Sequence, residues 1–351
     1  MTEAGAVETQ PVRDAHRIDE ATLGTYLADH VEGFGGTMEV RQFPIGQSNP
    51  TYQLITGGRR YVLRKKPPGK LLPSAHAVDR EYKVMKALAA SDVPVPAALH
   101  LCQDETVIGT DFFVMAMVEG RVFHDPGLPG MTPAERGTYF DDYIRILAAL
   151  HAVDPADVGL SAFGRPQGYL ERQVARWSTQ YEASKTEDIP AMDRIIDWLP
   201  KNLPADTSVS IVHGDYRPGN TITDAAKPTI AAVLDWELST LGHPLADLGY
   251  CCAAYHGKIS SVGDFSLLDH AALGIPTETE FVEKYCHYSG RDGIDDFAYY
   301  VIFSLFRSAA IIQGVYKRGL DGNASSEQAL EFGNMARGRA ETAWQLVEEN
   351  F

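Results

Sequence analysis

Two short polar segments hold the residues best suited to chemistry: HGDYRPGN at 213–220 and DWE at 235–237. Asp215, Asn220 and Asp235 offer carboxylate and amide oxygens, which are hard ligands. Such ligands suit a magnesium ion that bridges nucleotide phosphates better than they suit a soft-metal site. The alternative is that these three residues only form turns or cap helices, because Asp and Asn are common at turn and capping positions.

Each polar segment follows an apolar run that is typical of a short strand. The runs are VSIV before the first segment and IAAV before the second. Loops at strand ends carry functional side chains because the scaffold beneath them is rigid. We therefore expect the three oxygen-bearing side chains to converge at these strand ends.

Composition describes an ordinary soluble globular protein of 351 residues, with 44% hydrophobic and 22% charged residues. Lys and Arg number 31 against 47 Asp and Glu, a formal charge of −16, which disfavours nucleic acid as a partner. The four cysteines form no CxxC or zinc-ligand set and suggest a cytoplasmic protein with reduced thiols. The most apolar stretch has Arg307 at its centre, so we expect a buried helix and no membrane span.

The first third of the chain reads as strands. Three β-rich runs fall within residues 37–66, and Gly57-Gly58 between the second and third predicts a tight hairpin turn. A helix is expected over about residues 75–90, where apolar residues recur at helical spacing. VPVPAALHLC and DFFVMAMVEG supply two further strand-like segments.

Helices dominate the remainder. Thr132, Pro133 and Glu135 form a helix-start pattern that predicts a long helix to about His151. Further helices are expected near residues 168–184, 189–199, 277–289, 294–318 and 325–350. No HExxH, P-loop or GxSxG motif is present, which argues against those metal-hydrolase, P-loop and serine-hydrolase classes.

These elements predict an α+β fold with a small antiparallel-sheet lobe and a larger, mostly helical lobe. We expect an N-terminal tail and leading helix at 1–34, an N-lobe at 35–117 and a C-lobe at 118–351.

HGDYRPGN resembles the HxDxxxxN catalytic loop of the aminoglycoside phosphotransferase branch of the protein-kinase-like fold, and the resemblance covers roughly residues 35–345. It implies that the N-lobe binds the nucleotide and that the C-lobe holds the catalytic loop and the metal and acceptor sites. It also implies ATP as phosphoryl donor, Asp215 as catalytic base, and Asn220 and Asp235 as Mg²⁺ ligands. It also implies that His213 is structural and that Asp247 supports the loop. QSNPTY and VLRKKPPGKLLPSAH are most similar to the kinase-like portion fused to some acyl-CoA dehydrogenases.

The turn over residues 45–52 corresponds to the loop that covers ATP phosphates in kinases. Gly46 is its one glycine, so the resemblance assigns the phosphate contacts to Gln47, Ser48 and Asn49. The plainer alternative is a hairpin with no such role.

The phosphate-binding cation is expected in the following strand. We assign it to Arg64, with Lys65 or Lys66 as alternatives if the register shifts by one residue. Glu81 matches the acid that pairs with this cation, although the two could form only a weak exposed ion pair.

The resemblance also implies that adenine binds at a hinge between the lobes, near Met115 and Met117. The implied activity is phosphorylation of a hydroxyl group on a small molecule. The acceptor could be a hydroxyacyl-CoA or hydroxy acid, or an aminoglycoside-like compound or amino alcohol. The alternative function is that of a pseudokinase, which binds a nucleotide but does not turn it over. Two features favour this alternative: the turn at 45–52 has only one glycine, and Arg64 stands where many kinases have lysine. The sequence specifies no oligomeric state.

Overall fold

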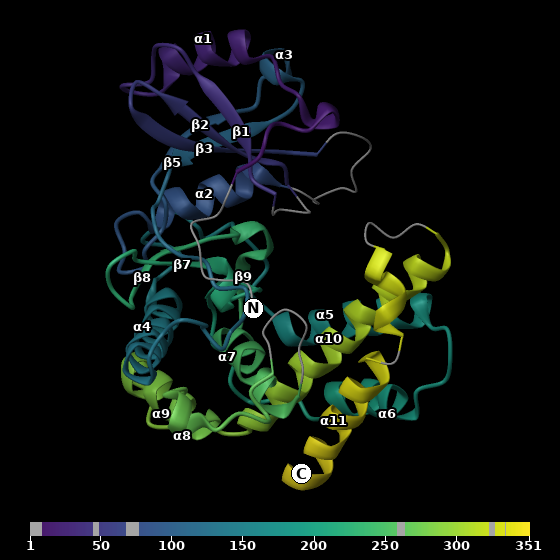
Figure 1. The fold of residues 1–351 in the computed structure, drawn as a ribbon. Coiled ribbons are helices and arrows are strands. Elements are labelled where there is room, and N and C mark those ends of the chain that lie inside the picture. The colour runs from purple at the N-terminus through teal and green to yellow at the C-terminus, as the bar shows by residue number, and fades with distance from the viewer. Residues whose placement is uncertain (1–8, 45–48, 68–76, 258–263, 323–326, 334) are drawn as a thin grey trace.

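An antiparallel sheet forms the N-terminal lobe in the computed structural model, which describes residues 9–44, 49–67, 77–257, 264–322, 327–333 and 335–351 (Figure 1). The strand order is β1-β2-β3-β5-β4. The strands are β1 (Glu39–Gln42), β2 (Thr51–Thr56), β3 (Arg59–Lys65), β4 (Ala98–Cys102) and β5 (Phe112–Ala116). Gly57 and Gly58 both have positive φ, which is the backbone that a two-residue hairpin between β2 and β3 requires.

Helices cover both faces of this sheet. On one face, apolar residues of α1 (Glu20–His30) pack with alternate residues of β2, β3 and β5, near the short helix α3 (Glu105–Ile108). On the other face, α2 (Val78–Leu88) buries its apolar side against the sheet and joins the core of the second lobe. The sheet is therefore held between two helical layers (Figure 1).

The second lobe is mostly helical, and its helices surround the two segments that carry the polar motifs. They are α4 (Pro133–Ala152), α5 (Tyr169–Ser184), α6 (Pro190–Trp198), α7 (Pro244–Cys252), α8 (His270–Leu273), α9 (Glu278–Ser289), α10 (Phe297–Leu320) and α11 (Met335–Asn350). Two pairs of short strands position the motifs: β6 (Ser210–Val212) with β9 (Thr240–Gly242), and β7 (Thr221–Thr223) with β8 (Ile230–Val233).

The connection between the lobes passes close to β7. Arg121 forms a bridge with Thr223, and a Cβ atom at Gly120 would lie 2.1 Å from the carbonyl oxygen of Thr223. Only glycine therefore fits this approach without a backbone shift.

The predicted α+β fold is confirmed. The helix that was expected after Thr132 begins there with a complete capping box between Thr132 and Glu135. The prediction missed α3, β7, β9, α7 and α8. Helix α7 buries all nine of its residues and so shows no amphipathic pattern, while the other four are only three or four residues long. The expected domain boundaries at 34/35 and 117/118 remain predictions.

Helix α10 is the one described helix that is long and apolar enough to cross a membrane by length and composition. Its most apolar window is 78% buried inside the protein. Core helices of globular proteins share this property, because a helix surrounded by other elements is apolar on most sides.

Candidate active site

The loop at 213–220 joins β6 to β7 and carries Asp215. Nδ2 of Asn220 donates a hydrogen bond to Oδ2 of Asp215 at 2.9 Å, and Nε of Arg217 donates to the same oxygen at 3.2 Å. The other carboxylate oxygen accepts a hydrogen bond from the hydroxyl of Tyr250. The Asp215 side chain is 23% exposed, so three donors orient a carboxylate that solvent or a ligand can still reach.

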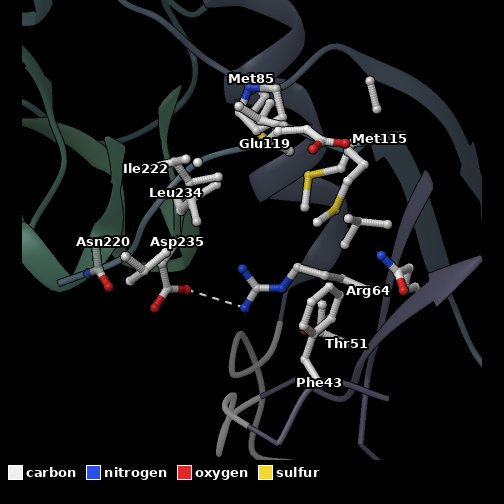
Figure 2. Close-up of a pocket in the computed structure, with 18 of the residues that line it drawn as sticks. Phe43, Thr51, Arg64, Met85, Met115, Glu119, Asn220, Ile222, Leu234 and Asp235 are labelled. Carbon is white, nitrogen blue, oxygen red and sulfur yellow. Dashed lines mark hydrogen bonds and ion pairs between the residues drawn. The ribbon is translucent and has the colours of Figure 1, made fainter. Parts of the chain in front are cut away.

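Asp235 begins the turn after β8 with an unusual backbone conformation. Its φ is +64°, in the left-handed region that few residues other than glycine, asparagine and aspartate adopt. The N–H of Leu234 donates to the carbonyl of Asn220 at 2.8 Å, which holds this turn beside the catalytic loop. The Asp235 and Asn220 side chains lie side by side at one end of a pocket (Figure 2).

Arg64 connects the sheet to this pair. Its guanidinium lies 2.5 Å from the carboxylate of Glu81 on α2 and 3.2 Å from that of Asp235 (Figure 2). The neighbouring lysines have other surroundings: Lys66 pairs with Asp111, and Lys65 lies over the ring of Tyr52. Of the three candidate cations, Arg64 is the one that lines the pocket.

Three carboxylates surround this single guanidinium. Burial raises the pKa of Glu81 to about 7; Arg64 opposes the shift, whereas Asp235 and Glu237 add to it. Burial lowers the pKa of Arg64, but the same three carboxylates outweigh burial and raise it. This end of the pocket thus holds a charged arginine and an excess of negative charge, which a bound cation would reduce.

The pocket lies between the sheet and the catalytic loop and has a volume of about 270 Å³. The residues just described form its charged end. Apolar side chains also line the pocket, among them Met115, Met117, Ile222 and Leu234, and so does the charged pair of Arg60 and Glu119. Figure 2 labels Met115, Glu119, Ile222 and Leu234. The N–H of Met117 donates to the carbonyl of Arg60 at 3.3 Å. Met115 and Met117 both line the pocket, and this N–H of Met117 is already engaged within the N-terminal lobe.

Asn49 is fully buried, and its Nδ2 donates to Oε2 of Glu237 at 3.2 Å. This hydrogen bond joins the segment before β2 to the turn after Asp235. The other two residues predicted to contact phosphate in this turn, Gln47 and Ser48, lie outside the described residues.

Asp247 supports the catalytic loop from α7. Its carboxylate accepts hydrogen bonds from the N–H groups of His213 at 2.6 Å and Gly214 at 3.0 Å. Burial raises the pKa of Asp247, but the ring of His151 and the contacts with His213 outweigh burial, so the pKa is lowered. In the His213 ring, Nδ1 faces the N–H of Asp215 and Nε2 faces the carbonyl of Leu234, which fits a structural role for this imidazole.

The donor set fits a magnesium nucleotide better than a metal held by protein alone. Among the residues described, no group of three or more His, Cys, Asp or Glu side chains is arranged to bind a metal. Magnesium is commonly held by one or two carboxylates, with substrate phosphates and water completing its shell. Counting only partners among the described residues, Nε of Arg64 in the pocket lining and Oδ1 of Asn49, which is on the residue bonded to Glu237, are buried without a hydrogen bond, as expected for groups that await a polar ligand.

Three residues near Asp215 were missed as functional candidates. Tyr250 follows Asp247 by one helical turn, a spacing that a prediction of α7 would have exposed. Arg217 lies inside the motif itself. Arg307 was expected in a buried helix and given no role, yet its Nη2 donates to the carbonyl of Gly214 at 2.8 Å.

Comparison with known proteins agrees with this geometry. A profile of the phosphotransferase enzyme family matches residues 39–293. A crystal structure from Ralstonia eutropha, provisionally described as an aminoglycoside phosphotransferase, is 47% identical with a TM-score of 0.87, covering 95% of this chain and 99% of that one. Spectinomycin phosphotransferase, solved with ADP and spectinomycin, has a TM-score of 0.63 at 13% identity, covers 97% of this chain and 100% of that chain, and shows the shared fold alone.

Curated relatives are longer proteins. Acyl-CoA dehydrogenase family member 10 of Mus musculus is 45% identical over 98% of this chain, which corresponds to 32% of its own length. Member 11 of Homo sapiens is 41% identical over 99% of this chain and 45% of its own length. The chain thus spans less than half the length of these relatives. It belongs to the phosphotransferase enzyme family, in the branch that includes the kinase-like portion of these acyl-CoA dehydrogenase relatives.

Proposed function

We propose that this protein transfers the γ-phosphoryl group of ATP to a hydroxyl group of a small molecule, with Mg²⁺ as cofactor. The observation that carries the proposal is the Asp215–Asn220 hydrogen bond beside Asp235, at the charged end of a pocket that apolar side chains also line. Apolar lining suits a nucleotide base, and a charged end suits its phosphates.

Each group has a role that follows from its position. Arg64, oriented by Glu81, binds the α- and β-phosphates, and Asn49 lies at the same end of the pocket. Asn220 and Asp235 hold Mg²⁺, which neutralises phosphate charge when it is bound. Met115 and Met117 contact the base through their side chains. Asp215 orients the acceptor hydroxyl and takes its proton as the oxygen–phosphorus bond forms and ADP departs.

The acceptor is a small molecule with a free hydroxyl group. A hydroxyacyl-CoA or hydroxy acid accords with the names of the acyl-CoA dehydrogenase relatives, and an aminoglycoside-like compound or amino alcohol accords with the solved structures of this fold. A cytoplasmic location and the absence of nucleic-acid and membrane partners remain predictions.

The test is phosphate transfer from labelled ATP to hydroxyacyl-CoAs, hydroxy acids, aminoglycosides and amino alcohols. We expect Asp215→Asn to lower turnover by about 100-fold or more while the affinity for Mg·ADP stays within about twofold. Asp197→Asn is the control, because Asp197 on α6 is 70% exposed and its one ion pair within the described ranges is with Lys201 in the turn that follows.

Two results would contradict the proposal. Full activity of Asp215→Asn would remove its assigned role. Tight Mg·ADP binding by the unmodified protein, with no phosphorylated product from any acceptor, would favour the pseudokinase alternative.

A further inference from the structure

A second cavity lies in the helical lobe, between the start of α10 and the end of α11, hereafter the α10–α11 cavity. Its volume is about 380 Å³, compared with about 270 Å³ for the pocket at Asp235. Among the described residues, none lines both. The end of α11 that borders the cavity lies at the end of the helical lobe away from the sheet (Figure 1). A ligand in this cavity would therefore be separate from a nucleotide bound at Arg64.

The cavity has an apolar wall. The ends of α9, α10 and α11 and of the short 3₁₀ helix Ala253–His256 all border it. Val301 and Leu346 contribute buried aliphatic side chains, and Phe297 and Phe351 contribute aromatic rings. Sites for small molecules commonly combine such apolar lining with a few polar groups that fix the orientation of the ligand.

Two carboxylates supply the charge of the cavity. Nε2 of His256 lies 2.9 Å from each carboxylate oxygen of Glu278, at the start of α9. Asp296 precedes α10, and within the described part of the chain its carboxylate has no hydrogen bond or ion pair. The lining residues that the structure describes include no Lys or Arg. His256 can offset at most one carboxylate, so these side chains keep a net negative charge whether the ring is neutral or protonated.

The helix ends leave this sign unchanged. The N-terminus of α10 carries a partial positive charge, but the C-terminus of α11 carries a partial negative charge of similar size beside the same cavity. The last carbonyl groups of a helix also lack N–H partners within it, so they can accept hydrogen bonds. An ammonium group has three donors and no acceptor, and it is attracted to aromatic rings as well as to carboxylates.

We propose that the α10–α11 cavity binds a small organic cation, in which an ammonium group is attached to an apolar or aromatic group. The ammonium group lies at Glu278 and Asp296, and the apolar part contacts Val301, Leu346 and Phe297. This inference does not rest on the proposed function, because no described residue of the nucleotide pocket lines this cavity. A bound cation connects the starts of α9 and α10 to the end of α11 and therefore stabilises the folded protein.

The test is calorimetric titration with benzylamine, benzyl alcohol and benzoate, which share a ring and differ in charge at pH 7. We expect benzylamine to bind with one-to-one stoichiometry and to raise the melting temperature. Benzyl alcohol should bind about 10-fold more weakly or less, because it lacks the charge-assisted hydrogen bonds, and benzoate should not bind. Saturation with Mg·ADP should leave the benzylamine affinity within about twofold.

Three results of this titration would overturn the inference. They are the absence of benzylamine binding, equal affinity for benzylamine and either of the other two probes, and competition between benzylamine and Mg·ADP.

Variants locate the site. Glu278→Gln and Asp296→Asn should each weaken benzylamine by about 10-fold. Asp296→Asn poses little folding risk, because Asp296 is exposed and asparagine tolerates its φ of +51°. Ala298→Leu should abolish binding, because Ala298 lines the cavity and a larger side chain there fills part of it.

Asp295→Asn is the matched control. It makes the same change of charge one residue from Asp296, and Asp295 is also exposed but is not among the described lining residues. Its benzylamine affinity should equal that of the unmodified protein. Melting temperatures without ligand report whether each variant is folded. Equal benzylamine affinity in Asp295→Asn, Asp296→Asn and Glu278→Gln would overturn the inference.

Discussion

Individual side chains around Asp215 and Arg64 have partners that set their charge and direction. Asp215 accepts from Asn220, Arg217 and Tyr250, so its lone pairs have fixed directions before any substrate binds. Such prior orientation lowers the entropic cost of reaching a reactive geometry. At the same charged end of the pocket, Glu81 and Asp235 hold Arg64 between two carboxylates.

The raised pKa of Glu81 predicts a pH-dependent contribution to stability. Below about pH 4.5 this carboxyl group is protonated in both the folded and unfolded states, and between pH 4.5 and about 7 the unfolded state loses the proton first. Folding therefore becomes less favourable as the pH rises through this window. Relative to the unmodified protein, Glu81→Gln should gain on the order of 2 to 3 kcal/mol in unfolding free energy between pH 5 and pH 8.

Urea denaturation at the two pH values measures this difference. Glutamine has nearly the shape of glutamate and does not titrate, so the change with pH isolates the titration of Glu81, including the charge–charge attraction to Arg64 that the ionised form gains. Glu341→Gln, at an exposed position of α11, should show no such change. An equal effect of Glu81→Gln at pH 5 and pH 8 would show that the carboxyl titrates normally.

Helix α7 positions the loop at 213–220 through two of its side chains. It carries Asp247, which holds the catalytic loop, and Tyr250 one turn later, which contacts Asp215. All nine of its residues are buried, and it packs tightly against α10. A Cβ atom at Gly249 would lie 2.5 Å from the main chain of Tyr300, so the two helices approach closely at this glycine.

Gly249→Ala should therefore destabilise the protein by about 1 to 3 kcal/mol or more, because backbone atoms of α10 must move. The matched control is Gly338→Ala in α11, where an added Cβ meets nothing within 4 Å. That change should stabilise the protein by up to about 1 kcal/mol through helix propensity. Thermal and urea unfolding of both variants measure the contrast, and equal stabilities would show that α7 and α10 can separate without cost.

The molecule as a whole brings its two lobes together at the charged end of the pocket. Arg64 of the sheet contacts Asp235, and Asn49 before β2 contacts Glu237. A nucleotide in the pocket would touch both lobes and would therefore favour their joint folded arrangement.

Mg·ADP at 100 times its dissociation constant should raise the unfolding free energy by about 2.7 kcal/mol. Asp235→Asn should lose the magnesium-dependent part of this gain and keep the fold, since asparagine tolerates the left-handed backbone at this position. Thermal unfolding with ADP, in the presence of Mg²⁺ or EDTA, measures both effects, with Asp197→Asn as control. Equal magnesium-dependent stabilisation of Asp235→Asn and the unmodified protein would contradict the metal-ligand role.

Local rules were enough to predict much of this molecule. The hairpin at Gly57-Gly58, the capping box at Thr132 and the strand ends before Asp215 and Asp235 depend on residues a few positions apart, so the sequence alone determined them. The alternation of β3 likewise placed Arg64 toward the pocket and its neighbour Lys65 elsewhere.

Only the tertiary structure decided which distant groups meet. Tyr250 reaches Asp215 across 35 positions, Arg307 reaches Gly214 across 93, and Asn49 reaches Glu237 across 188. Such contacts depend on how whole helices pack, which no local pattern encodes. Helix α7 was missed for the same reason: its burial on every side comes from the surrounding helices, and that burial removes the polar face by which a surface helix is predicted.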